Sequence, residues 1–282
     1  MRLGGHMNLD LNTVWSRGMK LVGDNLQLLV VLAGIFLLLP TVAVYLLLPD
    51  FQMLVEPGAD PEIVAERMGE LIGPLIGVGG LLALFQFAGY GAMIALIGPD
   101  RPTVAQALVT GIKIVPSTIV VMILFAIAYF IGAIILIVPF SILGGVAGAP
   151  AVAVIGVIPV LVFVVWLMAR LSMSMPVLVL GGTLNPFTAM KTSFKLTGPK
   201  QWQIMLFWAV LMIAFTVISL LFNGGVGVIA ALLGTGTAAL LVAGLANGLT
   251  GMASGMIISG IAAAMFEQLS GPSLDAIKDT FE

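Results

Sequence analysis

Charged residues are scarce in this chain: they make up 9% of its 282 residues, against about 25% in a soluble protein. Apolar residue types make up 60%, and a soluble fold could not cover its surface with so little charge. A water-soluble globular enzyme is therefore excluded. The composition instead predicts an all-α polytopic membrane protein.

Cysteine is absent, and His6 is the only histidine. The first absence excludes disulfides, thiolate metal sites and cysteine nucleophiles, and a lone histidine excludes a histidine-cluster metal site. No carboxylate pair or catalytic triad can be assembled from the apolar segments. We therefore expect no enzymatic activity, no metal ion, no cofactor and no nucleic-acid partner.

Six apolar runs have the roughly 20 residues that a membrane-spanning helix needs. They are Asn25–Leu48, Leu71–Ile97, Ile114–Val138, Ala151–Leu171, Gln201–Phe222 and Ala238–Phe266. Residues 226–234, between glycine-rich breakers, are too few to span, so we expect an interfacial or re-entrant piece there. We expect one transmembrane domain over residues 7–271 and a cytoplasmic tail over 272–282, while residues 1–6 resemble an expression-vector remnant.

The basic residues are divided unequally between the two sides of a six-helix bundle. Nine share one side: Arg17, Lys20, Arg101, Lys113, Arg170, Lys191, Lys195, Lys200 and Lys278. The opposite side has only Arg67, within an acidic loop over residues 49–70 in which Asp60 and Pro61 predict the start of a short helix. The positive-inside rule then places both termini in the cytoplasm and the acidic loop outside.

Similar short segments precede the first, third and fifth apolar runs. Each contains a small residue, an apolar residue, a lysine and a second apolar residue ahead of a Gly or Pro breaker. We expect interfacial elbow helices at Leu11–Val22, Thr103–Lys113 and Pro186–Leu196, each followed by a transmembrane hairpin, so that the repeats cover 11–97, 102–171 and 185–267. In the third elbow, Phe187 and Phe194 are expected at the acyl boundary and the lysines among headgroups.

The segment from Met175 to Trp202 is distinctive. It contains Pro176, then a Ser-x-basic-Leu-Thr-Gly core at residues 193–198, then the aromatic Trp202. This segment resembles the glycerophosphoryl diester phosphodiesterase membrane-domain family and related uncharacterised six-helix bacterial inner-membrane proteins. The resemblance implies a module of the bacterial inner membrane. It does not imply hydrolysis, because the phosphodiesterase domain of that family has no counterpart in the sequence.

Cations near the helix entries are candidates for binding lipid headgroups. They are Lys20, Lys113, Arg170, Lys191, Lys195 and Lys200. Arginine grips phosphate with two parallel hydrogen bonds, and basic pockets between helices favour acidic lipids. The alternative is that these cations only determine topology, with Arg170 extending its charged end to the interface.

Small and neutral polar residues recur along the sixth run, and a polar pair lies in the second. The first set is Gly244, Asn247, Gly248, Gly251, Gly255 and Ser259, and the pair is Gln86 and Tyr90. A small-residue face lets another helix approach closely, from this chain, a second copy or another membrane protein. The alternative is a surface along which a solute or lipid passes, with Asn247 as a polar contact on the way.

These features favour a non-catalytic inner-membrane protein that handles or organises lipids or amphiphiles, with membrane lipids, including anionic ones, as partners. The alternative is a transporter or channel for a small neutral or amphiphilic solute. Coupled carriers normally place ionisable groups at mid-membrane, and the apolar runs hold none at their centres.

Topology can be tested by single-cysteine labelling because the chain has no native cysteine. We expect Glu56→Cys to react with a membrane-impermeant maleimide added outside intact cells, since the basic residues hold the opposite face in the cytoplasm. Lys195→Cys is the control and should react only after the membrane is opened. Labelling of Glu56→Cys from the cytoplasmic side alone would contradict this topology.

Overall fold

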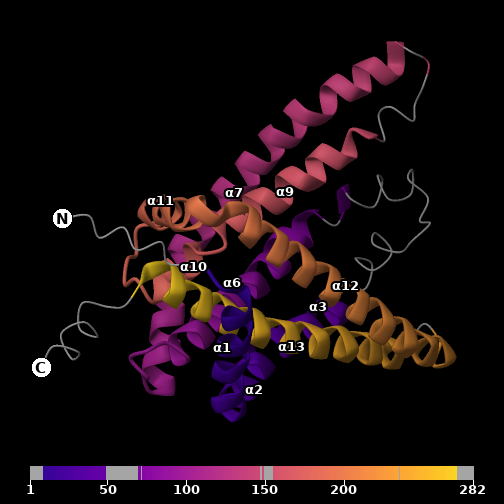
Figure 1. Cartoon of the computed structure of the whole chain (residues 1–282). Helices are drawn as coiled ribbons and strands as arrows, with labels where there is room; N and C mark the ends of the chain where they lie inside the picture. Colours follow the sequence, from indigo (N-terminus) through magenta and orange to yellow (C-terminus); the bar gives the residue numbers. More distant parts are fainter. Residues whose placement is uncertain are drawn as a thin grey trace, which may run out of the picture. The chain divides into compact units, whose positions relative to one another are not determined.

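The computed structural model describes residues 9–48, 69–70, 72–146, 148, 155–234 and 236–271. Within these residues the regular structure is entirely helical (Figure 1). The α-helices are α1 (Leu11–Asp24), α2 (Leu26–Ala33), α3 (Leu39–Leu47), α6 (Gly80–Leu96), α7 (Val104–Val146), α9 (Val157–Leu171), α10 (Ser174–Val179), α11 (Pro186–Thr197), α12 (Gln201–Leu232) and α13 (Thr237–Ser270). The π-helical turns η1 (Gly34–Leu38) and η2 (Leu75–Gly79) and the 3-10 turn η3 (Gly198–Lys200) complete the set.

Six helical stretches among the described residues are long and apolar enough to cross a membrane. They are Leu26–Leu47, Ile72–Leu96, Val104–Val146, Val157–Val179, Pro186–Leu232 and Thr237–Ser270. Their outward side chains are large and apolar: Val146 is 85% exposed and Leu232 is 84% exposed. Exposure on this scale is stable where hydrocarbon replaces water, so the predicted all-α polytopic class with six membrane-spanning helices is confirmed.

Two sequence-based boundaries are wrong. Residues 226–232 continue α12 to Leu232 without a break, so they are not the separate re-entrant or interfacial piece that was expected. The second expected elbow, Thr103–Lys113, is not a separate helix, because α7 runs unbroken from Val104 and contains Pro116. Both errors have one cause: in hydrocarbon, backbone groups have no water to bond, and the helix persists through residues that would end it in water.

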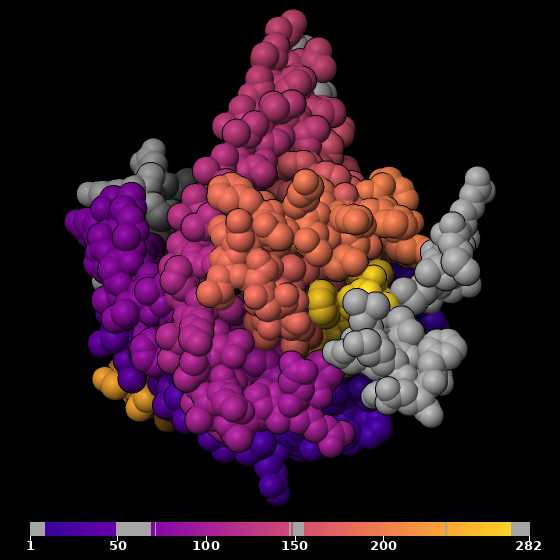
Figure 2. Space-filling model, turned by 90° about the vertical axis from the view of Figure 1, so that its left-hand side faces the viewer, coloured from indigo at the N-terminus to yellow at the C-terminus, as the bar shows by residue number. Residues whose placement is uncertain are grey.

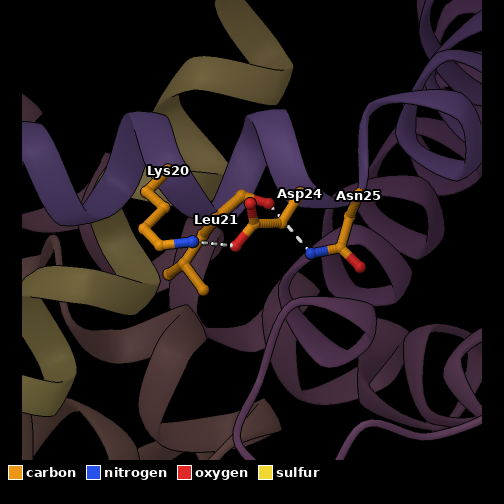
Figure 3. Close-up of polar contacts among 4 residues, drawn as sticks. All are labelled: Lys20, Leu21, Asp24 and Asn25. Atoms are coloured by element: carbon orange, nitrogen blue, oxygen red, sulfur yellow. Dashed lines mark hydrogen bonds and ion pairs between the residues drawn. The ribbon is translucent and has the colours of Figure 1, made fainter.

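The other two elbows are separate helices. α1 begins at Leu11 where Asp10 caps it: one carboxylate oxygen accepts from the Asn12 N–H at 3.0 Å and the other from the Thr13 hydroxyl at 2.6 Å. These bonds lower the pKa of Asp10 because they favour the ionised form. At its other end, Asn25 donates to the Leu21 carbonyl at 2.9 Å (Figure 3).

α11 begins at Pro186, as expected from the sequence. The Asn185 side chain accepts from the backbone N–H groups of Phe187 and Thr188 at 3.0 and 3.2 Å, and proline occupies the first helical position, where its missing N–H costs nothing. The helix ends at Thr197, directly before η3. The expected helix at Asp60, residues 1–6 and the tail at 272–282 lie outside the described residues.

The chain divides into two compact units. One comprises Met1–Val14, Pro116–Met212 and Met265–Glu282, and the other comprises Trp15–Val115 and Ile213–Ala264. In the first unit, the part of α7 after Pro116 runs beside α9 (Figure 1), where Gly132 leaves room for the Phe163 ring. In the same unit α9, α10 and α11 pack together.

The second unit depends on close helix crossings at glycines. A Cβ on Gly111 of α7 would overlap the Ala88 carbonyl oxygen and lie 2.7 Å from the Ala92 nitrogen of α6. A Cβ on Gly260 of α13 would lie 2.7 Å from the Gly18 carbonyl oxygen of α1. Backbones that approach this closely gain dispersion contacts that larger side chains would prevent.

The α6–α7 crossing gives a stability test. Gly111→Ala should destabilise the protein by about 1–3 kcal/mol, because the methyl group meets rigid backbone. Gly225→Ala is the matched control: the space around its Cβ position is open, so it should gain up to about 1 kcal/mol from helix propensity. Thermal unfolding in detergent measures both, and equal melting temperatures for the two variants would contradict the close crossing.

Candidate functional site

Arg170 lies at the end of α9, where the chain turns through α10 toward α11. Two hydroxyls on the buried face of α11 hold this turn. The Ser193 hydroxyl donates to the Arg170 carbonyl at 2.7 Å and accepts from the Met173 N–H at 3.2 Å. The Thr197 hydroxyl donates to the Ser193 carbonyl of its own helix at 2.8 Å and lies 3.3 Å from the Arg170 carbonyl at the end of α9. Ser193 and Thr197 are fully buried, so the backbone around Arg170 is fixed by bonds that water does not weaken.

The guanidinium of Arg170 packs against α11. Its Nη1 donates to the Thr197 hydroxyl at 3.1 Å, and its Cζ stands 4.5 Å from the centre of the Phe194 ring. Its Nε is buried and makes no hydrogen bond to a described residue. A Cβ on Gly198 would lie 3.1 Å from Nη1 of Arg170. The glycine that begins η3 therefore leaves enough space for the guanidinium.

No carboxylate among the described residues pairs with Arg170. Cation–π contact with Phe194 stabilises the charge by roughly 0.5–2 kcal/mol without neutralising it. The Phe194 ring, expected at the acyl boundary of the membrane, packs against other side chains of the chain. Phe194 is half-buried, with the guanidinium on one side and Trp166 in edge-to-face contact at 6.3 Å. The fully outward ring of α11 is Phe187, which is 65% exposed.

The structure gathers four of the six predicted headgroup cations on one short stretch. We call Arg170, Lys191, Lys195 and Lys200 the basic elbow. Lys191 and Lys195 are exposed on α11, and Lys200 is half-buried in η3. This segment, orange in Figure 2, lies open on that face of the molecule. The elbow therefore presents positive charge to its surroundings.

The other two cations lie in the second unit. Lys20 pairs with Asp24 one turn later in α1, at 2.6 Å (Figure 3). Exposed pairs of this kind contribute little to stability, but the carboxylate cancels much of the charge that Lys20 would offer a headgroup. Lys113 is exposed on α7.

The small-residue face of α13 divides between two environments. Gly244 and Gly248 stand against Tyr45 and Leu38, with Cβ positions 3.1 Å from the nearest side-chain atoms, and Gly255 stands against Leu37 and Tyr90. Ser259 is fully buried, and its hydroxyl has no hydrogen-bond partner among the described residues. Asn247 and Gly251 instead line a cleft.

Gln86 and Tyr90, the polar pair of the second apolar run, lie one turn apart on α6. Within the described part of the chain, no hydrogen bond is formed by either side chain. The Tyr90 hydroxyl lies 3.2 Å from the Cβ position of Gly255 on α13. Tyr90 thus contacts α13 through the space that a glycine leaves.

The cleft lies between α12 and α13, within the second unit, and has a volume of about 540 Å³. Its lining is uncharged and comprises Phe215, Thr216, Ile218, Ser219, Leu220, Asn247, Thr250, Gly251, Ala253, Ser254 and Ile257. Sequence reasoning found Asn247 and Gly251 but missed Ser219, Thr250 and Ser254. The available signal was a second polar pair four residues apart: Ser219 near the end of the fifth apolar run and Asn223 directly after it.

Among the described residues, no three His, Cys, Asp or Glu side chains gather where they could hold a metal ion. The chemistry that both sites offer is therefore hydrogen bonding and, at the basic elbow, attraction of anions. Comparisons of the chain with protein-family models, curated proteins and solved structures give no match.

The hydrogen bonds at the α9–α11 turn predict the effect of one substitution. Ser193→Ala should lower the free energy of unfolding by about 1–3 kcal/mol, because it leaves the buried Met173 N–H without its acceptor. The matched control is Ser141→Ala, an exposed serine whose hydroxyl bonds only to the Ile137 carbonyl of its own helix, and it should change stability by less than about 0.5 kcal/mol. Denaturant titration in detergent measures the difference, and an equal effect of both variants would show that Ser193 does not hold the turn.

Proposed function

We propose that this integral membrane protein is a non-catalytic component of a bacterial inner membrane that binds anionic lipid headgroups through the basic elbow. One observation carries the proposal: the Arg170 guanidinium is held on α11 with a buried, unbonded Nε and no carboxylate partner among the described residues. A phosphate oxygen would supply the missing acceptor and the missing negative charge.

The arrangement suits phosphate for two reasons. Arginine presents several N–H donors in a fixed plane that matches phosphate oxygens, and Thr197 and Phe194 already restrict that plane. Less ordering entropy is then lost on binding. The lysines are mobile point charges, and each cation near an anionic surface contributes about 1 kcal/mol.

The resemblance of residues 175–202 to bacterial inner-membrane modules agrees with this proposal, since the three lysines of the basic elbow lie within the resembling segment and Arg170 lies five residues before it. Cytoplasmic placement of the elbow follows from the distribution of basic residues. Organisation or handling of anionic lipid is the role that best accounts for an uncompensated cation cluster beside otherwise uncharged helices.

The proposal predicts a loss of lipid selectivity. Arg170→Gln with Lys195→Gln should lower the retention of phosphatidylglycerol relative to phosphatidylcholine by roughly 5- to 30-fold, as two cations at about 1 kcal/mol each imply. Native mass spectrometry of protein released from mixed nanodiscs measures this ratio. Lys195→Gln alone, at an exposed position, should give roughly a fivefold loss and covers failure of the double variant to fold.

The control is Lys20→Gln, which removes a cation of the second unit whose charge Asp24 already offsets. It should leave the retention ratio within about twofold of the unchanged protein. Equal retention by Lys20→Gln and by Arg170→Gln with Lys195→Gln would show that the elbow cations set topology only.

A further inference from the structure

We propose that the cleft between α12 and α13 binds an uncharged amphiphile whose headgroup carries hydroxyl groups, as diacylglycerol does. This site goes beyond the anionic-lipid function of the basic elbow, shares no residue with it, and selects the opposite class of headgroup. The inference rests on the polar groups of the cleft, on their unused hydrogen-bonding capacity and on the apolar rim.

Asn223 organises the polar side of the cleft. Its Nδ2 donates to the Ser219 carbonyl at 2.9 Å and approaches the Ser219 hydroxyl at 3.0 Å and the Thr250 hydroxyl at 3.4 Å. It thereby joins α12 to α13 beside the two lining residues. Its Oδ1 is buried and has no hydrogen-bond partner among the described residues.

Further capacity remains at the cleft wall. The Ser219 hydroxyl accepts from Asn223 but donates to no described residue, and Asn247 uses one of its N–H groups on the Ala243 carbonyl at 3.1 Å while its Oδ1 accepts from none. The site therefore offers both donors and acceptors. A hydroxyl group, which also donates and accepts, is the smallest headgroup that can use both.

Unused hydrogen-bonding groups are costly in a membrane. A buried acceptor without a donor costs about 1–3 kcal/mol, and acyl chains alone have nothing to donate. A hydroxylated headgroup in the cleft could pair with the Ser219 hydroxyl and with Asn247 Oδ1, which belong to lining residues, whereas a simple hydrocarbon chain in the same space would leave both unbonded.

The absence of charge in the cleft lining decides against an ionic headgroup. All lining side chains are neutral, so a phosphate or an ammonium group entering the cleft would lose hydration without gaining a counter-charge. An uncharged polyol head loses far less. The charge of the lipid headgroup therefore has opposite effects at the two sites: a negative charge favours binding at the basic elbow and disfavours binding in the cleft.

The rim and the size of the cleft fit an amphiphile. Ile218 and Leu220 are 59% and 68% exposed beside the polar groups and present apolar surface where an acyl chain would emerge. The volume of about 540 Å³ lies within the usual range for small-molecule sites, roughly 300–1,000 Å³. Gly251 keeps this volume open, because nothing lies within 4 Å of its Cβ position.

Filling the cleft is the direct test. Gly251→Leu should lower diacylglycerol retention about tenfold, because the new side chain occupies the site without meeting backbone. Gly225→Leu is the matched control: it adds the same side chain at an α12 glycine that is also surrounded by open space and lies outside the cleft lining, and it should retain diacylglycerol like the unchanged protein. The probe is nanodiscs of phosphatidylcholine that contain either diacylglycerol or phosphatidic acid with the same acyl chains, read by native mass spectrometry.

A second variant removes hydrogen bonding without changing volume. Thr250→Val removes a hydroxyl that lines the cleft and lies 3.4 Å from Asn223 Nδ2, and should lower diacylglycerol retention several-fold. Thr41→Val removes a hydroxyl that bonds to the Leu37 carbonyl of its own helix and lies outside the cleft lining, and should not change retention. This pair tests the site if Gly251→Leu does not fold. Phosphatidic acid retention should be insensitive to both cleft variants and sensitive to Arg170→Gln with Lys195→Gln, so failure of the cleft proposal is distinguishable from failure of the elbow proposal.

Three results would overturn the inference. One is equal diacylglycerol retention in the unchanged protein, Gly251→Leu and Thr250→Val. Another is a preference of the unchanged protein for phosphatidic acid that Gly251→Leu abolishes. The third is a change in oligomer size with Gly251→Leu and none in lipid retention, which would assign the cleft to a second copy of the chain.

Discussion

Backbone hydrogen bonding in hydrocarbon is the constraint on which the rest of this structure depends. Each peptide N–H and C=O group within the membrane must be satisfied inside its own helix, since an unsatisfied group costs several kcal/mol. This cost exceeds the roughly 1 kcal/mol by which a glycine weakens a helix. It explains why α12 continues through Gly224, Gly225 and Gly227 to Leu232, and why Pro116 and Pro139 both lie within α7.

Because the backbone hydrogen bonds are formed inside each helix, the contacts between helices depend on the side chains. Glycines permit backbone contact at the α6–α7 and α1–α13 crossings, and the hydroxyls of Ser193 and Thr197 hold the α9–α11 turn. The basic elbow carries four cations, whereas the side chains that line the cleft between α12 and α13 are neutral. This separation follows the free-energy cost of burying each type of group: a neutral hydroxyl costs less to bury between helices than a cation does.

The sequence predicts the helical class, the six spans and the start of α11 at Pro186, because run length and the Asn-Pro capping pattern depend on local physics. The continuity of α7 and α12 could not be read in the same way, since Gly and Pro are strong breakers in water and weaker ones in lipid. The contacts between helices could not be predicted from the sequence either. Nothing in the spacing of Arg170 and Phe194, or of Asn223 and Thr250, fixes which helix faces meet, and each pair is separated by more than twenty residues.

The π-helical turn η1 has a mechanical consequence. Its consecutive residues Phe36, Leu37 and Leu38 face Gly89 of α6 and Gly255 and Gly248 of α13, respectively. η1 therefore packs between α6 and α13. Tightly packed interiors change between discrete arrangements and do not deform smoothly. If α13 moved along its axis, Leu37 and Leu38 would lose the space that Gly255 and Gly248 leave them. The packing of Phe36 against Gly89 of α6 would then have to change as well. Within this unit η1 therefore joins the packing of α6 to that of α13, although the two helices are far apart in the sequence.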